Sequence, residues 1–363
     1  MRLSYSFVLA SDVLEKKMAE EDICFIHKDT LVIKSPKKSP LILRTVVILF
    51  VMVCGVYICS ISVKQRNTGD NSTDRFLNVN IKDQTCPNIT GVKESEFRYL
   101  HYPKPKTFSR NECACNPVRY FVILSMQRSG SGWFETLLNN HTNASSNGEI
   151  FSVAERRSNI STILETMDKV YNLDWFTSAS KNECSAAVGF KWMLNQGFMK
   201  HHNEIAEYFN KNGISTIFLF RRNLLRRMIS VLANSYDSKA KLLNGTHKSH
   251  VHSPVEAQIL ANYKPTIPIK SLLQDLKQVE EDSAKAISYL NGTKQIVLYY
   301  EDLIKNRTKL IDVQNFLKLP YRDLKSRQVK IHTGPLSNHV ANWEDIKKTL
   351  NGTSYEKFLH SSY

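Results

Sequence analysis

Several features common in nucleotide and metal enzymes are missing from this 363-residue sequence. There is no kinase-type loop G-x-x-x-x-G-K-[ST], which weakens the case for a nucleoside triphosphatase. The C-x-C pair Cys113–Cys115 is followed by no second cysteine pair and no His-x-x-x-His, so we expect no metal. Internal repeats and long low-complexity tracts are also absent, which argues against a repeat array.

Composition and charge indicate a folded, basic protein. Hydrophobic residues make up 42% and charged residues 23% of the chain, which argues against bulk disorder. The formal net charge of +15 favours acidic partners: nucleic acid, anionic lipid, or sulfated and phosphorylated small molecules. A merely basic, soluble surface is the plainer alternative, and charge alone does not decide between the two.

One uncharged apolar stretch predicts a membrane anchor. Residues 45–63 read TVVILFVMVCGVYICSISV, and as a helix they would span about 28 Å, close to the thickness of the hydrocarbon core. Four cations precede the stretch closely: Lys34, Lys37, Lys38 and Arg44. Only Lys64 and Arg66 follow it closely, and Asp70 and Asp74 come soon after. By the positive-inside rule we expect a cytoplasmic tail at 1–44 and a luminal remainder, as in a type II protein of the Golgi membrane. A buried core helix is the structural alternative.

The cysteines and glycosylation sequons fit that orientation. Four cysteines follow the predicted span: Cys86, Cys113, Cys115 and Cys184. In an oxidising compartment they allow two disulfides, with three possible pairings. All the Asn-x-Ser/Thr sequons also follow it, at Asn71, Asn88, Asn140, Asn143, Asn159, Asn244, Asn291, Asn306 and Asn351.

The luminal part divides into a stem and a folded domain. Residues 64–117 are polar, with scattered prolines, and predict a tether. From 118 to 363, apolar runs alternate with helix-length segments. We expect strands at 120–125, 186–193, 215–221 and 295–299, and helices at 131–140, 200–212, 224–236, 268–290 and 308–319, with Gly213 at the C′ position of the second helix. This pattern predicts a three-layer α/β/α domain with a central, mainly parallel sheet.

The loop after the first predicted strand suits an anion. It reads Gln127-Arg128-Ser129-Gly130-Ser131-Gly132-Trp133 and leads into a helix. A helix N-terminus presents backbone N–H groups and a positive dipole end, and the loop adds a guanidinium and two hydroxyls. Phosphate or sulfate is the expected ligand, and a plain tight turn is the alternative.

This loop resembles the 5′-phosphosulfate loop of the sulfotransferases, which runs Pro-Lys-Ser-Gly-Thr-Thr-Trp directly after the first strand. Arg128 stands at the lysine position, Ser129, Gly130 and Trp133 are identical, and Ser131 is a conservative match. Gly132 stands where the pattern has its second threonine. The resemblance implies a P-loop-like sulfotransferase fold. It also implies that 3′-phosphoadenosine 5′-phosphosulfate is the donor, bound by the residues of this loop.

A second signature of the family is an arginine at a strand end and a serine eight residues later, which together hold the 3′-phosphate. Arg222 and Ser230 match it. For Arg221, Arg226 and Arg227 we expect a solvated helix face. A 3′-phosphate contact would select the sulfate donor over adenosine triphosphate, which has no 3′-phosphate.

The resemblance extends to the end of the chain. The sequence pattern is most similar to that of the carbohydrate and nodulation-type sulfotransferases. It includes Tyr300–Leu303, and Leu336, Ser337, Asn342 and Trp343. The Arg-Lys-Gly of the cytosolic enzymes is missing, and residues 330–334 (KIHTG) are our candidate for the segment that covers the donor.

Sulfuryl transfer needs a base and cations that stabilise the departing charge. Arg128 is the candidate for charge stabilisation, and Lys191 is a further residue that could face the site. Glu149 resembles the glutamate of the carbohydrate-type enzymes and is the favoured base, with His141 as a rival that we expect at the surface. Glu301 and Asp302 are expected to cap or brace the loops.

We therefore expect a sulfotransferase with a carbohydrate or glycolipid acceptor, no metal and no nucleic-acid partner. A P-loop kinase and a non-catalytic receptor with the same fold are the alternatives. The sequence leaves the acceptor, the oligomeric state and the disulfide pairing open.

Overall fold

The computed structural model describes residues 45–46, 48–57, 93–181 and 184–360. The chain divides into two compact units, Met1–Gln84 and Thr85–Tyr363. In the first unit, residues 45–46 and 48–57 are helical, and their apolar side chains are exposed. Over the residues that are described, no helix is long and apolar enough to cross a membrane. A span needs about 20 residues, and the predicted one continues into 58–63, outside the described part, so the anchor stays a prediction.

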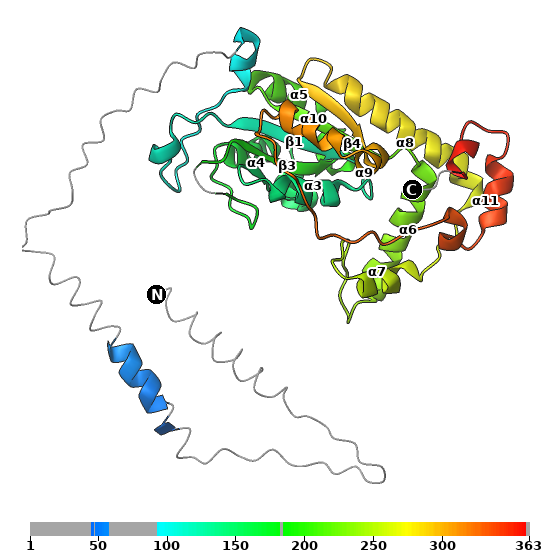
Figure 1. Ribbon diagram of the computed structural model, residues 1–363, viewed down its shortest axis with the longest axis horizontal. Helices are drawn as coiled ribbons and strands as arrows, with labels where there is room; N and C mark the ends of the chain where they lie inside the picture. The colour runs from blue at the N-terminus through cyan, green and yellow to red at the C-terminus, as the bar shows by residue number, and fades with distance from the viewer. Residues whose placement is uncertain (1–44, 47, 58–92, 182–183, 361–363) are drawn as a thin grey trace, which may run out of the picture. The chain divides into compact units, whose positions relative to one another are not determined.

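The second unit contains a five-stranded parallel sheet in the order β2-β3-β1-β4-β5 (Figure 1). Its central strand, β1, pairs with β3 on one side and β4 on the other. Strands β1, β3 and β4 are largely apolar runs buried on both faces, which is typical of a sheet covered by helices on both sides. The bounds are β1 Arg119–Ser125, β2 Ala144–Ser146, β3 Ala187–Met193, β4 Ser215–Phe220 and β5 Gln295–Tyr299.

Helices cover both faces of the sheet because alternate side chains point to opposite faces. Val122 and Leu124 pack in one buried cluster with α4, α5 and α8, whereas Phe121 and Ile123 pack in another with α3 and α10. This is the predicted three-layer α/β/α arrangement. The bounds are α3 Ser131–Asn140, α4 Ile160–Tyr171, α5 His202–Lys211, α8 Ile269–Tyr289 and α10 Thr308–Phe316.

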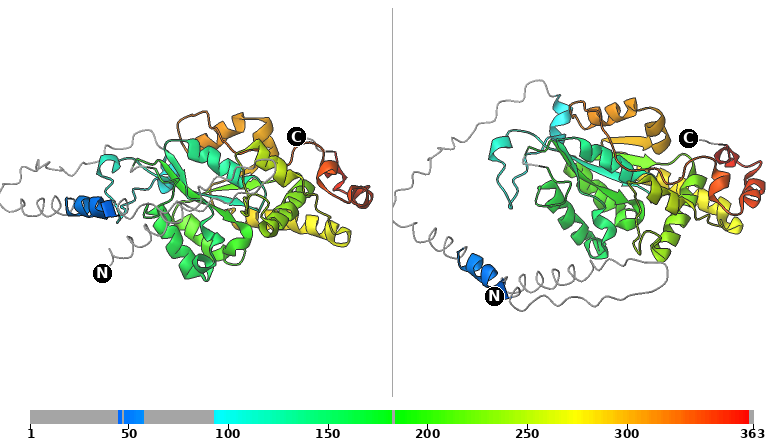
Figure 2. Two further views of the ribbon diagram at one scale, coloured as in Figure 1. Left: turned by 90° about the horizontal axis from the view of Figure 1, so that it is seen from below. Right: turned by 60° about the horizontal axis from the view of Figure 1, so that its bottom comes forward.

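A third buried cluster joins α6, the start of α8, and α11. Figure 2 shows the red C-terminal segment beside the yellow α8. A smaller cluster holds α7 against Val329 and Ile331. The remaining helices are α6 Leu224–Ala240, α7 Pro254–Ala261, α9 Tyr300–Lys305 and α11 Trp343–Leu350, with short turns at Glu94–Tyr99, Asn111–Cys113, Ile150–Ser152, Ala154–Arg157, Leu194–Phe198, Leu336–His339 and Glu356–Phe358.

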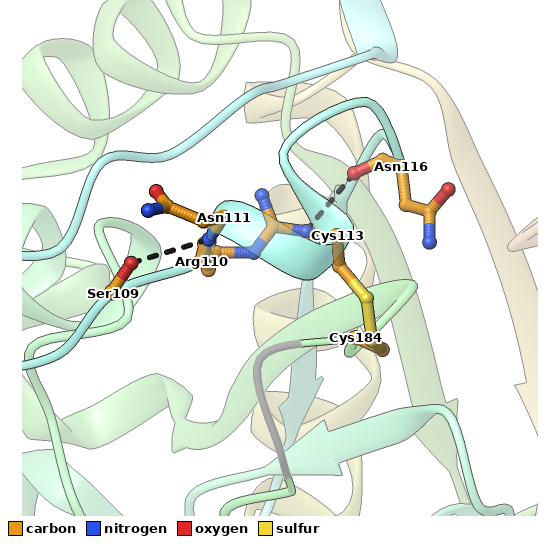
Figure 3. Close-up of a disulfide and its surroundings, with 6 residues drawn as sticks. All are labelled: Ser109, Arg110, Asn111, Cys113, Asn116 and Cys184. Carbon is orange, nitrogen blue, oxygen red and sulfur yellow. Dashed lines mark hydrogen bonds between the residues drawn. A yellow bond between two sulfur atoms is a disulfide. The ribbon is translucent and has the colours of Figure 1, made fainter. Parts of the chain in front are cut away.

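Residues 93–117, which the sequence assigns to the tether, belong to the second unit. Glu96 forms ion pairs with Arg119 of β1 and Lys294, at 3.0 and 3.1 Å. A disulfide joins Cys113 to Cys184 and so fastens this segment to the residues before β3 (Figure 3). Cys115 is also disulfide-bonded, and Cys86 lies outside the described residues.

The predicted strands and helices are present, with ends that move by a few residues. Helix α3 has the predicted bounds, and α6 continues to Ala240 rather than ending near Tyr236. Gly213 follows α5 at φ 54°, as expected of a C′ glycine. The sequence analysis missed β2, α4, α7, α9 and α11. Strand β2 is only Ala-Ser-Ser, and it exists because β3 supplies its hydrogen-bond partners.

Candidate active site

The loop between β1 and α3 forms the floor of the site. Arg128 and Gly130 both have left-handed backbone conformations, at φ 62° and 86°. A Cβ on Gly130 would lie 2.3 Å from a ring carbon of Tyr300, so only glycine fits there. Gly130 is followed directly by Ser131, the first residue of α3, and no side chain caps the helix. The first backbone N–H groups of α3 are therefore available to an anion.

A cavity of about 470 Å³ opens above this loop at the carboxyl ends of the strands. The predicted loop residues Arg128, Gly130 and Trp133 line it, and Ser129 lies just below with its hydroxyl buried. Over the part of the chain described, that hydroxyl has no hydrogen-bond partner. The other polar and charged residues of the wall are Gln127, Ser131, Glu149, Lys191, Arg221, Arg226, Ser230, Asn234, Ser235, Ser238, Ser249, His250, Tyr300, Gln328, Lys330 and His332.

Arg128 connects the loop with α6. Its Nε donates to Ser230 Oγ at 2.9 Å, and its Nη1 donates to the carbonyl of Ser249 at 2.6 Å. Burial, together with the charge of Arg221, lowers the pKa of Arg128 to about 10. The guanidinium is still charged at neutral pH, and a bound anion would relieve the cost of holding that charge among other cations.

Three arginines of the β4–α6 region are not the solvated helix face that the sequence suggested. Arg226 is fully buried, and its Nη2 donates to the carbonyl of Gly334 at 2.9 Å. Arg221 packs over the ring of Tyr300, 4.6 Å from its centroid. Burial, followed by the charge of Arg221, lowers the pKa of Arg227 to about 10. That expectation was wrong because α6 packs with its first turns against the cavity and the core.

The predicted Arg222–Ser230 pair is separated in the structure. Ser230 lines the cavity above the loop, but Arg222 lines a second cavity of about 550 Å³. Arg222 makes a two-point ion pair with Asp302, at 3.0 and 2.7 Å, and lies over the ring of Tyr299. Arg221, one residue earlier, takes the place in the first cavity that was expected of Arg222. Successive side chains at the end of a strand point to opposite sides, which accounts for the difference.

The carboxylate of Glu301 braces the turn between β4 and α6, as expected. It is buried and accepts hydrogen bonds from the backbone N–H groups of Arg222 and Asn223, at 2.9 and 3.3 Å. Glu301 also forms an ion pair with Arg221, at 3.8 Å. A fixed negative charge therefore holds the cationic wall in place.

Glu149 and Lys191 meet on the opposite wall of the cavity. Lys191 Nζ lies 3.6 Å from Glu149 and 3.3 Å from Glu135 of α3. Gln196 Nε2 donates to Glu149 at 2.5 Å. Glu135, which the sequence analysis missed, also accepts from Ser146 and from the backbone of Gly148, at 2.6 and 2.9 Å. This buried carboxylate ties the Glu149 segment to the helix that begins at the loop.

His141, the rival base, lies away from the cavity. It is fully buried, contrary to the expected surface position. Its Nδ1 accepts from the backbone N–H of Asn143, and Nε2 pairs with the carbonyl of Pro320 at 3.0 Å. The tautomer that satisfies both contacts carries its proton on Nε2. His141 therefore fastens a loop and faces no reacting group.

Residues 330–334 do reach the site, as the sequence suggested. Lys330 and His332 line the cavity, and Gly334 receives Arg226. Burial, together with Arg226 and Arg221, lowers the pKa of Lys330 to about 8. The late residues Leu336 and Asn342 are structural, since Leu336 is buried in the core and Asn342 pairs with the backbone of Ile267.

The charge of the cavity suits a ligand with several negative charges. Arg128, Lys191, Arg221, Arg226 and Lys330 all contribute to its wall, against the single carboxylate of Glu149. Burial and the charge of Arg221 lower the pKa of Arg128, and burial with the charges of Arg226 and Arg221 lowers that of Lys330, as expected of cations in a partly desolvated space. In the described ranges, no group of three or more His, Cys, Asp or Glu residues could hold a metal ion.

Comparisons with known proteins agree with the predicted class of enzyme. No protein-family model matches the chain. Nodulation protein H of Rhizobium meliloti is 23% identical over 248 residues, covering 67% of this chain and 96% of that protein. The protein of the same name from strain 1021 is 22% identical over 247 residues, with the same coverage of each chain.

Three solved structures align with low scores. The sulfotransferase domain of the curacin biosynthetic pathway is 17% identical, with a TM-score of 0.32, and covers 66% of this chain and 88% of its own. A sulfotransferase from Alicyclobacillus acidocaldarius is 11% identical, with a TM-score of 0.32, covering 58% and 85%. A mouse sulfotransferase complexed with PAP is 13% identical, with a TM-score of 0.29, covering 66% and 74%. At these scores the architecture rests on the strand order of the chain itself.

Proposed function

We propose that this chain transfers a sulfuryl group from 3′-phosphoadenosine 5′-phosphosulfate to a hydroxyl group of a carbohydrate or glycolipid. Sulfotransferase activity is the part that the loop motif and the comparisons support together. The donor and the acceptor are the finer part of the proposal.

The contact between Arg128 and Ser230 carries the proposal. It joins two motifs that lie 102 residues apart in the sequence, at the carboxyl ends of β1 and β4. A loop that suits a phosphosulfate and the β4–α6 region, which offers Ser230 and the two arginines Arg221 and Arg226, thereby face one cavity. An adenosine nucleotide with phosphates at both its 5′ and 3′ positions would place one anionic group near each motif.

In the proposed reaction the acceptor oxygen attacks sulfur, and the bond from sulfur to the bridging oxygen breaks. The electron pair leaves with adenosine 3′,5′-bisphosphate, and the hydroxyl proton passes to a base. Arg128 and the N-terminus of α3 stabilise the charge on the departing oxygen, with Lys191 on the opposite wall. Glu149 is the proposed base; the salt bridge and hydrogen bond that it makes hold its carboxylate at the cavity.

The cellular setting is also a proposal: a single-span anchor at 45–63 and a luminal catalytic domain in the Golgi. Support comes from the uncharged apolar stretch and from the disulfide Cys113–Cys184, a bond that persists in oxidising compartments. Protease protection of tagged termini in microsomes tests it, and a protease-accessible catalytic domain would contradict it.

The function is tested by binding and by transfer. Calorimetry compares adenosine 3′,5′-bisphosphate with adenosine triphosphate, and we expect the bisphosphate to bind more tightly. Preferential binding of the triphosphate would instead favour a P-loop kinase. Radiolabelled donor and a glycan library then identify the acceptor. Tight donor binding without transfer to any glycan, glycolipid or peptide would favour a non-catalytic member of the fold.

A further inference from the structure

The side chain of His250 lines the cavity, although no sequence motif marked this residue. His250 lies against Gly132, the second residue of α3, and a Cβ on that glycine would be 2.2 Å from His250 Nε2. The sulfotransferase loop pattern has a threonine at this position. Here the imidazole fills the space that a side chain at Gly132 would occupy, next to the first turn of α3.

The position of His250 is fixed by the residues before it. The carbonyl of Ser249 receives Arg128, at 2.6 Å. His247 Nδ1 pairs with the buried carboxylate of Asp237 on α6 at 2.6 Å, and Lys248 pairs with Glu256 on α7, also at 2.6 Å. The three residues before His250 are therefore held by α6, by α7 and by the loop, in that order. His250 itself faces the N-terminus of α3.

The ring of His250 is chemically available. It lines the cavity, and no hydrogen bond to it is found among residues 45–46, 48–57, 93–181 and 184–360. The charged and titratable groups that act on it are Arg128 from the loop, Lys191 from β3 and His252 from its own segment. His250 is exposed as a whole residue, but its ring is partly buried, and this burial, followed by the charges of Arg128 and Lys191, lowers its pKa to about 4. A neutral imidazole has one N–H donor to offer to an anion.

We propose that His250 binds the 5′-phosphosulfate of the donor through an imidazole N–H, in the side-chain position that Gly132 leaves vacant. This inference rests on the proposed function, since it names a further ligand of the same donor. Three groups then surround the phosphosulfate: the N-terminus of α3, Arg128 and His250.

A measurable consequence is proton uptake. In the free protein the ring is uncharged above about pH 4. A bound phosphate favours the charged form of a neighbouring histidine, so the pKa rises in the complex. Between the two pKa values, binding of the anion must then take up protons at His250.

The experiment uses the full chain, purified in detergent, and adenosine 3′,5′-bisphosphate as the probe. Calorimetry at pH 6 in two buffers of different ionisation enthalpy gives affinity and proton uptake together. We expect His250→Gln to weaken binding roughly 10- to 100-fold, as for one hydrogen bond to a charged group. Binding of the bisphosphate to His250→Gln should also take up fewer protons than binding to the parent protein. His360→Gln is the matched control, since His360 is exposed and does not line the cavity, and should behave as the parent.

A double variant guards against a merely structural effect. Gly132→Thr alone should weaken binding, because the new side chain meets the His250 ring. Gly132→Thr combined with His250→Ala removes the clash and supplies a hydroxyl, and should recover part of the affinity without the proton uptake. Unchanged affinity and uptake in His250→Gln would overturn the inference while leaving the donor proposal intact. A parent protein that does not bind the bisphosphate would overturn the proposed function itself.

Discussion

Arg128 and Ser230 are joined by a hydrogen bond of 2.9 Å between Nε and Oγ, and this contact closes one end of the candidate active site. Because a phosphosulfate would bind beside the guanidinium, we expect Arg128→Ala to lower kcat/KM by about 100-fold or more, as for loss of a charge-stabilising group. Ser230→Ala should weaken bisphosphate binding by about 10-fold. Steady-state kinetics and calorimetry measure the two effects.

The control for the serine is Ser288→Ala, since Ser288 is exposed on α8 and its hydroxyl contacts only its own helix. Equal affinity for Ser230→Ala and Ser288→Ala would exclude Ser230 from the donor site.

The neighbouring arginines Arg221 and Arg222 give a matched pair. The structure puts Arg221 in the cavity above the loop and Arg222 in an exposed ion pair with Asp302. We therefore expect Arg221→Ala to weaken binding of adenosine 3′,5′-bisphosphate by about 10-fold or more. Arg222→Ala should change it little and lower the free energy of unfolding by at most about 1 kcal/mol. The opposite order of affinities would favour the assignment made from the Arg222–Ser230 spacing.

Glu149 is the proposed base, so Glu149→Gln should lower kcat by about 100-fold while bisphosphate affinity changes little, since a base acts on the acceptor. Glu155→Gln, in the exposed turn that follows, is the control. Rapid-quench measurements of a single turnover separate chemistry from product release. A full rate for Glu149→Gln would mean that another group takes the proton.

Donor binding should depend on pH through Lys330. Burial and the nearby arginines lower its pKa to about 8, so it is charged below that pH and neutral above it. Affinity for the bisphosphate should therefore fall several-fold between pH 7 and pH 9.5. In Lys330→Arg the guanidinium stays charged, and the loss should be smaller. If the two proteins lose the same affinity, Lys330 does not contact the ligand.

The disulfide Cys113–Cys184 closes a loop of 71 residues. Replacing both cysteines by serine should lower the free energy of unfolding by about 2–4 kcal/mol, the range typical of disulfides. Denaturant titration measures this change, and peptide mapping under non-reducing conditions checks the pairing. Recovery of a Cys113–Cys115 or Cys86–Cys184 peptide instead would contradict the structure.

Local sequence determined the four longer strands and the candidate anion-binding loop of this protein. Runs such as 120–125 are apolar on both faces, and this alone marks a buried parallel strand. Arg128, Gly130 and Ser131 lie within a few residues of one another, so their spacing was enough to predict a loop before a helix. The membrane anchor and the luminal setting likewise rest on the sequence, and they stay predictions.

Only the tertiary structure decided which side chains meet. A difference of one residue after β4 decides that Arg221 lines the first cavity while Arg222 lines only the second, because side-chain direction alternates along an extended chain. Glu135 and His250 carry no motif, since their roles depend on contacts with segments far away in the chain. The sequence therefore predicted where an anion would bind, and the packing of α6 and of residues 247–250 against the loop decided which groups surround it.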